Sequence, residues 1–107
     1  MKFGLREETI QKINTVFARY PEIEEVVIYG SRAKGNFREG SDIDITLKGA
    51  AVTERIRSRV WLDIDDLNTP YLFDISVYYQ LKSESLLEHI NRAGKTFYQK
   101  EEQNISI

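Results

Sequence analysis

The sequence contains no cysteine and only one histidine, and each scarcity excludes a class of site. Without cysteine there is neither a disulfide framework nor a thiolate metal site. The single histidine, His89, has no second histidine beside it and no serine or cysteine nucleophile context, so a hydrolytic triad is not supported. A metal site in this chain would therefore use oxygen ligands, which favour Mg²⁺ or Mn²⁺ over zinc.

The chain also lacks an excess of positive charge and any long hydrophobic run. Its 15 Lys and Arg residues are outnumbered by 17 Asp and Glu residues, which gives a formal net charge of −2. Strong non-specific binding of nucleic acid needs a broad basic field, so any such contact must be local. The longest apolar runs, such as residues 26–29, are far shorter than the roughly 20 residues of a membrane span. No signal peptide is evident, and the expected location is the cytoplasm.

Length and composition predict one globular domain. The chain has 107 residues, of which 41% are hydrophobic and 30% charged, and only two are proline. A chain of this size can bury a single core without disulfides or metals. We expect residues 1–100 to form the domain, whereas residues 101–107 show no periodicity and are expected to fray.

Helical and strand periodicities alternate along the chain. Helices are expected over residues 5–20, 31–34 (a single turn), 53–67 with Thr53 as its N-cap, and from Ser83 or Ser85 to a left-handed Gly94. Strands are expected over residues 24–29, 42–47, 71–79 and, at an edge, 95–98. This order predicts an α/β (α+β) domain in which a small mixed β-sheet has helices packed on one face.

Two acids stand two residues apart in the second expected strand. Asp42 and Asp44 alternate with apolar residues, so their carboxylates lie on one face, about 6.5 to 7 Å apart at the backbone. Neighbouring carboxylates repel each other, and keeping both ionised requires a metal or a basic partner. A strand with a charged face in solvent would show the same pattern. In contrast, Asp63 and Asp65 fall on an expected helix, where residues two apart diverge, and we interpret them with Asp66 as a solvated helix end.

Asp74 is a third notable acid because it stands inside an otherwise apolar strand. Acids are depleted in strands and need a partner or solvent there. If this strand lies beside the strand with Asp42 and Asp44, the three carboxylates share one face and could hold two metal ions. The alternative is an edge-strand charge that simply faces water.

The segment between the first two strands has the composition of a phosphate-binding loop. Gly30 permits close approach of the backbone to a ligand, and Ser31 begins a helical turn whose N–H groups and hydroxyl can bind phosphate. Three basic side chains nearby, Arg32, Lys34 and Arg38, could neutralise a triphosphate. An ordinary turn with an N-cap and solvated basic residues would give the same local pattern.

Together these residues resemble a known family pattern, in which Gly-Ser and a Gly-containing loop precede Ser-Asp-Ile-Asp, and a single strand Asp follows about 30 positions later. The chain resembles the nucleotidyltransferase superfamily of DNA polymerase beta and, in its short form, the minimal nucleotidyltransferase (MNT) proteins. The resemblance spans nearly the whole chain, with Lys34 where arginine is common, and implies a polymerase beta palm-like fold. The matching positions are Gly30, Ser31, Gly35, Ser41, Asp42, Asp44 and Asp74.

The resemblance also implies roles for residues in and near this pattern. Asp42 and Asp44 would ligate Mg²⁺ (or Mn²⁺), and Asp74 would complete the metal site and help to deprotonate the acceptor. Nucleotide binding is expected at Gly30, Ser31, Arg32 and Ser41.

Proteins of the MNT type are commonly paired with a small helical HEPN protein in a toxin–antitoxin module. The expected function is therefore that of an antitoxin which transfers AMP from ATP to a tyrosine of a HEPN ribonuclease toxin. Two alternatives stay open: transfer to a small hydroxylated molecule, and a non-catalytic antitoxin that masks its partner by binding. The acceptor, the nucleotide base and the homo- or hetero-oligomeric state are not fixed by the sequence.

Overall fold

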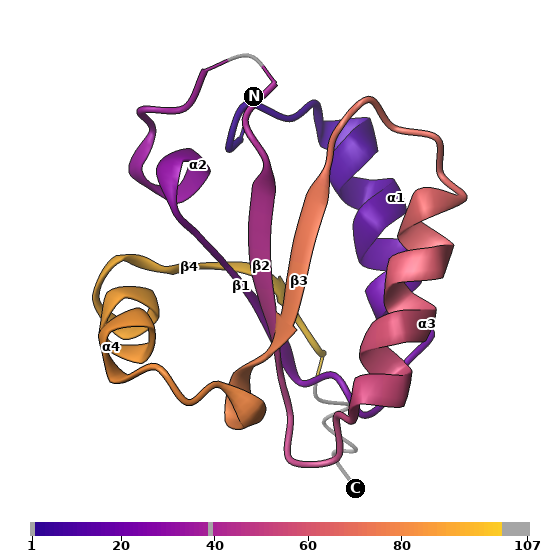
Figure 1. Ribbon diagram of the computed structural model, residues 1–107. Coiled ribbons are helices and arrows are strands. Elements are labelled where there is room, and N and C mark those ends of the chain that lie inside the picture. The colour runs from indigo at the N-terminus through magenta and orange to yellow at the C-terminus, as the bar shows by residue number, and fades with distance from the viewer. Residues whose placement is uncertain (1, 39, 102–107) are drawn as a thin grey trace, which may run out of the picture.

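A computed structural model describes residues 2–38 and 40–101 of the chain. One four-stranded sheet, in the order β3-β2-β1-β4, forms the centre of the fold, with helices on both sides (Figure 1). In chain order the elements are α1 (Glu7–Ala18), β1 (Glu25–Tyr29), α2 (Ser31–Lys34), β2 (Ile43–Lys48), α3 (Glu54–Asp65), β3 (Phe73–Val77), the 3₁₀ turn η1 (Tyr78–Gln80), α4 (Glu84–Ala93) and β4 (Lys95–Gln99).

The sheet is mixed, as the sequence predicts. Strand β1 pairs antiparallel with both β2 and β4, whereas β2 and β3 are parallel and are connected through α3. Parallel neighbours need such a crossover, because the chain must return to the same end of the sheet. The parallel register pairs Asp44 with Asp74, so the strand with the single acid does lie beside the strand with the acid pair.

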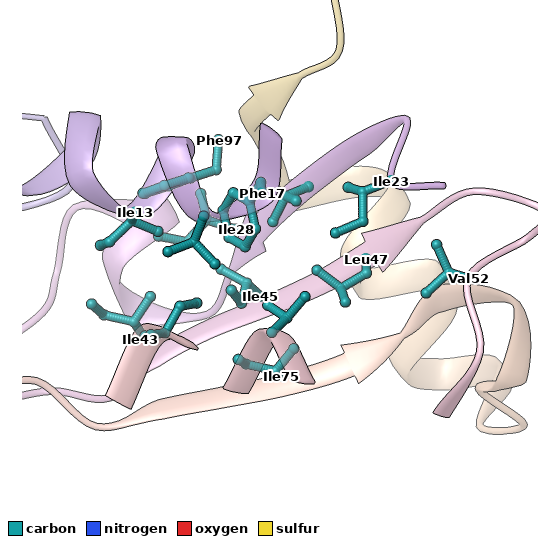
Figure 2. Packing of buried hydrophobic residues seen from close by; sticks show 14 of the residues in the cluster. Ile13, Phe17, Ile23, Ile28, Ile43, Ile45, Leu47, Val52, Ile75 and Phe97 are labelled. Atoms are coloured by element: carbon teal, nitrogen blue, oxygen red, sulfur yellow. The ribbon is translucent and has the colours of Figure 1, made fainter. Parts of the chain in front are cut away.

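The main core lies between the sheet and the two longer helices, α1 and α3 (Figures 1 and 2). Alternate residues of β2 point into it, including Ile45, and they meet Phe17 of α1 and Val60 of α3. Because side chains alternate along a strand, the same alternation turns the polar residues of β2 to the opposite face. The two longer helices therefore pack on one face of the mixed sheet, as predicted, whereas α4 lies on the other face, which the prediction did not include.

Helix α4 covers part of the other face, beside β1. Its Ile90 packs against Val27 and Tyr29 in a second, smaller buried cluster. Strand β1 is therefore apolar on both sides, as its uninterrupted run of residues predicts. The rest of that face, over β2 and β3, carries the polar side chains.

Two helix starts agree with the prediction and one helix end does not. Thr53 caps α3 by accepting a hydrogen bond from the Ile56 N–H at 3.2 Å, and Ser83 caps α4. The left-handed conformation expected at Gly94 is wrong, because its φ is −70°. Glycine is needed there for another reason: a Cβ would lie 2.6 Å from Cγ1 of Val27 and closer still to the Ile90 carbonyl oxygen.

Of the tail expected to fray, residues 102–107 lie outside the described residues, and the domain boundary at residue 100 stays a prediction. Across residues 2–38 and 40–101, no helix is long and apolar enough to cross a membrane.

Candidate active site

A row of three polar side chains crosses the sheet on the face away from α1 and α3. Tyr29 of β1 pairs with Asp44 of β2, and Asp44 pairs in turn with Asp74 of β3. Residues in register on adjacent strands project from the same face, so the two carboxylates are direct neighbours. The structure thus brings together Asp44 and Asp74, which stand 30 positions apart in the sequence.

Asp44 is the acid most affected by this arrangement. It is half-buried, and burial is the largest cause of a raised pKa, followed by the negative charges of Asp74 and Asp42. Asp42 itself is exposed and directly precedes β2. The strand starts at Ile43, one residue later than the sequence predicts. Because desolvation and like charges both oppose ionisation, the site favours a positive group at Asp44.

Gly30 allows the Asp44 carboxylate to lie against the turn between β1 and α2. Its φ of +76° is in the region that favours glycine, and a Cβ there would lie 2.6 Å from Oδ2 of Asp44. Ser31 follows as the first residue of α2 and is half-buried. The turn expected from the sequence is therefore present, and it directly adjoins the Asp44 carboxylate.

Arg32 is placed differently from a solvated basic side chain. It is only 3% exposed, its Nε donates to the Ser41 carbonyl oxygen at 3.0 Å, and its Nη1 donates to the Phe3 carbonyl oxygen at 2.9 Å. The guanidinium also lies over the rings of Phe37 and Tyr71. These contacts indicate that Arg32 holds the loop to the N-terminal segment, and a phosphate-binding role for it stays a prediction.

Ser41 is also engaged within the loop. Its hydroxyl oxygen accepts a hydrogen bond from the Arg38 N–H at 2.9 Å, and its own N–H donates to the Arg38 carbonyl oxygen. This pair of bonds fixes the chain immediately before Asp42. Lys34 and Arg38 are exposed, as a solvated basic loop would place them.

Tyr29 is a site residue that sequence reasoning missed, because it was interpreted only as the apolar end of a strand. Its side chain is buried, and its ring lies edge-on to His89 of α4, with 6.3 Å between ring centroids. Burial raises the pKa of Tyr29, the Ser76 hydroxyl beside it opposes that rise, and the charges of Asp74 and Asp44 add to it. The Ser76 hydroxyl is buried and has no hydrogen bond of normal geometry within the described residues. Tyr29 therefore lies beside Asp44 on the same face of the sheet, where the charges of both carboxylates affect it.

The second pair of acids is not part of this site. Asp63 accepts a hydrogen bond from the Tyr20 hydroxyl and joins α3 to the end of α1. Its expected role as part of a solvated helix end is therefore wrong, although Asp65 and Asp66 are exposed as expected. The long-range partner of Asp63 could not be recognised from the local sequence. Asp65 is exposed and has no such bond to any side chain that the structure describes, so it is the better control for the acids of the sheet.

The donor chemistry of the acid row fits a hard divalent cation. We call Asp42, Asp44 and Asp74 the acid row; burial and then the charges of Asp74 and Asp42 raise the pKa of Asp44, and carboxylate oxygens are the ligands of Mg²⁺ and Mn²⁺. Within residues 2–38 and 40–101, however, no three acidic or histidine side chains already converge on one point. Binding a cation would therefore draw these side chains together.

The fold is that of a nucleotidyltransferase-type domain, and the comparisons agree. Residues 11–103 match the family model described as "Polymerase beta, Nucleotidyltransferase". The chain therefore belongs to the polymerase beta nucleotidyltransferase family, and we classify it as a nucleotidyltransferase. A comparison with curated proteins found no match.

Several solved structures share the fold. A chain of a toxin–antitoxin complex with AMP-PNP has a TM-score of 0.68 and 21% identity, over 90% of this chain and 75% of that one. A chain of the toxin–antitoxin MntA–HepT has a TM-score of 0.65 and 16% identity, over 89% and 74%. A chain from the tri-AMPylated Shewanella oneidensis HEPN toxin in complex with MNT antitoxin has a TM-score of 0.65 and 16% identity, over 90% and 74%. At these identities the likeness concerns the fold.

Proposed function

We propose that the protein is an MNT antitoxin that transfers AMP from ATP to a tyrosine hydroxyl of a HEPN ribonuclease toxin, with Mg²⁺ as cofactor. The observation that carries this proposal is the pairing of Asp44 with Asp74 beside the Gly30 turn, in a chain of the nucleotidyltransferase family. The fold likeness to chains of toxin–antitoxin complexes, one with AMP-PNP and one with an AMPylated HEPN toxin, supports the choice of nucleotide and partner.

The reaction is a displacement at the α-phosphorus of ATP. The acceptor oxygen forms a bond to that phosphorus, the bond to the bridging oxygen of the β-phosphate breaks, and pyrophosphate leaves. The hydroxyl proton passes to the carboxylate of Asp74, which is exposed on the open part of the sheet and can receive it. Gly30 and Ser31 would position the phosphates through the backbone at the start of α2.

The metal would be held by Asp42, Asp44 and Asp74. Mg²⁺, or Mn²⁺, would supply the positive charge that offsets the negative charge of the phosphates and of these three acids. The raised pKa of Asp44, caused first by burial and then by the charges of Asp74 and Asp42, supports this assignment, because a bound cation favours the ionised carboxylate.

The open sheet face also suits a macromolecular acceptor. Asp42 and Asp74 are both exposed, and α4 covers only the side of the face near β1. A docked protein could therefore bring a hydroxyl to the acid row and hold it in line with the phosphorus. Attaching AMP would add negative charge to the partner. This charge would repel the phosphates of RNA and weaken the partner's RNA binding.

The test uses the protein, its HEPN partner, ATP and Mg²⁺, with the intact mass of the partner as the readout. The expected result is a mass increase of one or more AMP units on a tyrosine, which is absent with Asp42→Asn and present with the control Asp65→Asn. If Asp42→Asn neutralises the toxin equally well with no added mass, the protein acts by masking. Release of pyrophosphate in the presence of a small hydroxylated molecule, with no change in the partner, would identify a different acceptor.

A further inference from the structure

A second open feature lies between the N-terminal segment, α2 and the start of β4. It is a groove of about 690 Å³, lined by Lys2 and Phe3, by Lys34 and Phe37, and by Lys95. None of the three acids of the site lines it, and neither does Gly30 or Ser31. The groove therefore differs from the proposed site around Asp44, although α2 contributes to both and Arg32, at which nucleotide binding is predicted, also lines the groove.

The groove concentrates positive charge in a chain whose net charge is −2. Lys2, Lys34 and Lys95 are all exposed, and no carboxylate belongs to the described lining. The neighbouring acid Glu25 accepts a hydrogen bond from the Thr96 hydroxyl at 2.7 Å, so one of its oxygens is already engaged. The Lys2 ammonium lies over the Phe3 ring, 5.5 Å from its centroid, and together with the exposed Lys34 and Lys95 it forms a local site for a polyanion.

Aromatic rings lie between these lysines, and their packing fixes them. Phe3 stacks on Phe97 with 5.8 Å between ring centroids. Phe37 lies under the Arg32 guanidinium at 5.0 Å and packs so closely on Gly4 that a Cβ there would clash with its ring. Both phenylalanine residues are half-buried and line the groove, with the Lys2 ammonium over the Phe3 ring. Fixed rings of this kind offer stacking surfaces without a loss of side-chain freedom on binding.

We propose that this groove binds a short single-stranded RNA segment, with phosphates at Lys2, Lys34 and Lys95 and unpaired bases against Phe3 and Phe37. Lysines that follow a backbone, interleaved with aromatic rings, are the usual means of binding single strands without sequence preference. A base pair in a duplex has no free face to stack on these rings. An acidic peptide would satisfy the lysines and leave the aromatic surfaces without a matching partner.

The test measures fluorescence anisotropy of a labelled oligouridine of about 10 nucleotides, at about 50 mM salt. We expect Lys34→Gln/Lys95→Gln to weaken binding about 10-fold and to reduce the salt slope by about 1.4, because each contacted phosphate of a single strand contributes about 0.7. The matched control is Lys12→Gln/Lys82→Gln, which removes the same charge from exposed positions outside the groove. The control should change the affinity less than about twofold, since only the long-range field is altered.

Phe37→Leu tests the stacking and should weaken RNA binding while leaving the salt slope unchanged. Three results would overturn the proposal: an equal loss in the two double variants, equal competition by a polyglutamate peptide of the same charge, and displacement of the RNA by Mg²⁺–ATP. The first would indicate a general charge effect, the second a peptide site and the third a part of the nucleotide site. Asp44→Asn should bind the RNA as the unaltered protein does, which keeps this test separate from the proposed transfer reaction.

Discussion

Gly30 and Asp44 approach each other so closely that there is no room for a single methyl group between them. A Cβ on Gly30 would lie 2.6 Å from Oδ2 of Asp44, and the φ of Gly30 is +76°. The turn that is expected to hold phosphate and the carboxylate that is expected to hold a cation are therefore one structural unit. Changes to either residue should affect the other.

Gly30→Ala should lower the rate of AMP transfer by at least about 10-fold, because the new Cβ displaces the Asp44 carboxylate by a distance that is large for a preorganised site. The matched control is Gly35→Ala. Gly35 has a similar φ of +84°, but a Cβ there would have no atom within 4 Å. Gly35→Ala should lose about 1 to 2 kcal/mol of stability from its left-handed backbone, and Gly30→Ala about 1 to 3 kcal/mol, because φ +76° with ψ −155° is a conformation that almost only glycine adopts. Equal transfer rates in the two variants would refute the link between Gly30 and Asp44.

Asp44→Asn should reduce Mg²⁺-dependent transfer by orders of magnitude and leave the fold intact, since it keeps the shape of the side chain and removes the charge. Asp65→Asn, at the exposed end of α3, is the control and should leave the rate nearly unchanged. The measurements are the transfer rate over a range of Mg²⁺ concentrations and the thermal unfolding midpoint. Similar losses in both variants would argue against a cation at the sheet face.

The raised pKa of Asp44 predicts a pH-dependent effect on stability. The folded chain holds the Asp44 proton more tightly than the unfolded chain does. This contribution to the free energy of unfolding is complete below the ordinary pKa of aspartate and is lost as the pH rises through the raised folded value. Without divalent cations, Asp44→Asn should therefore gain stability relative to the unaltered protein as the pH rises through this window. Urea unfolding of both proteins across the window checks this, and a constant difference would contradict it.

Asp74→Ala should separate binding from chemistry. If Asp74 chiefly receives the acceptor proton, the variant should retain measurable affinity for Mg²⁺–ATP while transfer is lost, because proton removal matters only in the transition state. Calorimetry of Mg²⁺–ATP binding and the partner's mass give the two readouts. Loss of ATP affinity as complete as in Asp44→Asn would instead make Asp74 mainly a ligand on the nucleotide side.

Most of the fold could be predicted because its signals are local. The spacing of Ile13, Val16 and Phe17 indicates α1, and the alternation around Asp44 identifies which face of β2 is buried. The pairing of Asp44 with Asp74 could be stated only as a condition, since strand order depends on packing of the whole chain.

The surroundings of the site were harder to predict because they depend on distant partners. Arg32 binds the Phe3 carbonyl from 29 positions away, and Asp63 binds Tyr20 from 43 positions away. Tyr29 gives no local signal at all, because a tyrosine at the end of a buried strand is ordinary. Its position beside the acids emerges only from the register of β1 with β2 and of β2 with β3.

The position of β3 at one end of the sheet has a consequence for control of the site. Asp74 belongs to a strand that is paired on one side, to β2, whereas Asp44 belongs to a strand that is paired on both. Strands at the rim of a sheet open locally at a smaller free-energy cost than central strands do. A brief detachment of β3 would separate the two carboxylates while the core around β1 stays folded. Amide hydrogen exchange should therefore be faster in β3 than in β1. A partner bound along β3 would oppose this opening and raise the fraction of molecules in which Asp44 and Asp74 are neighbours.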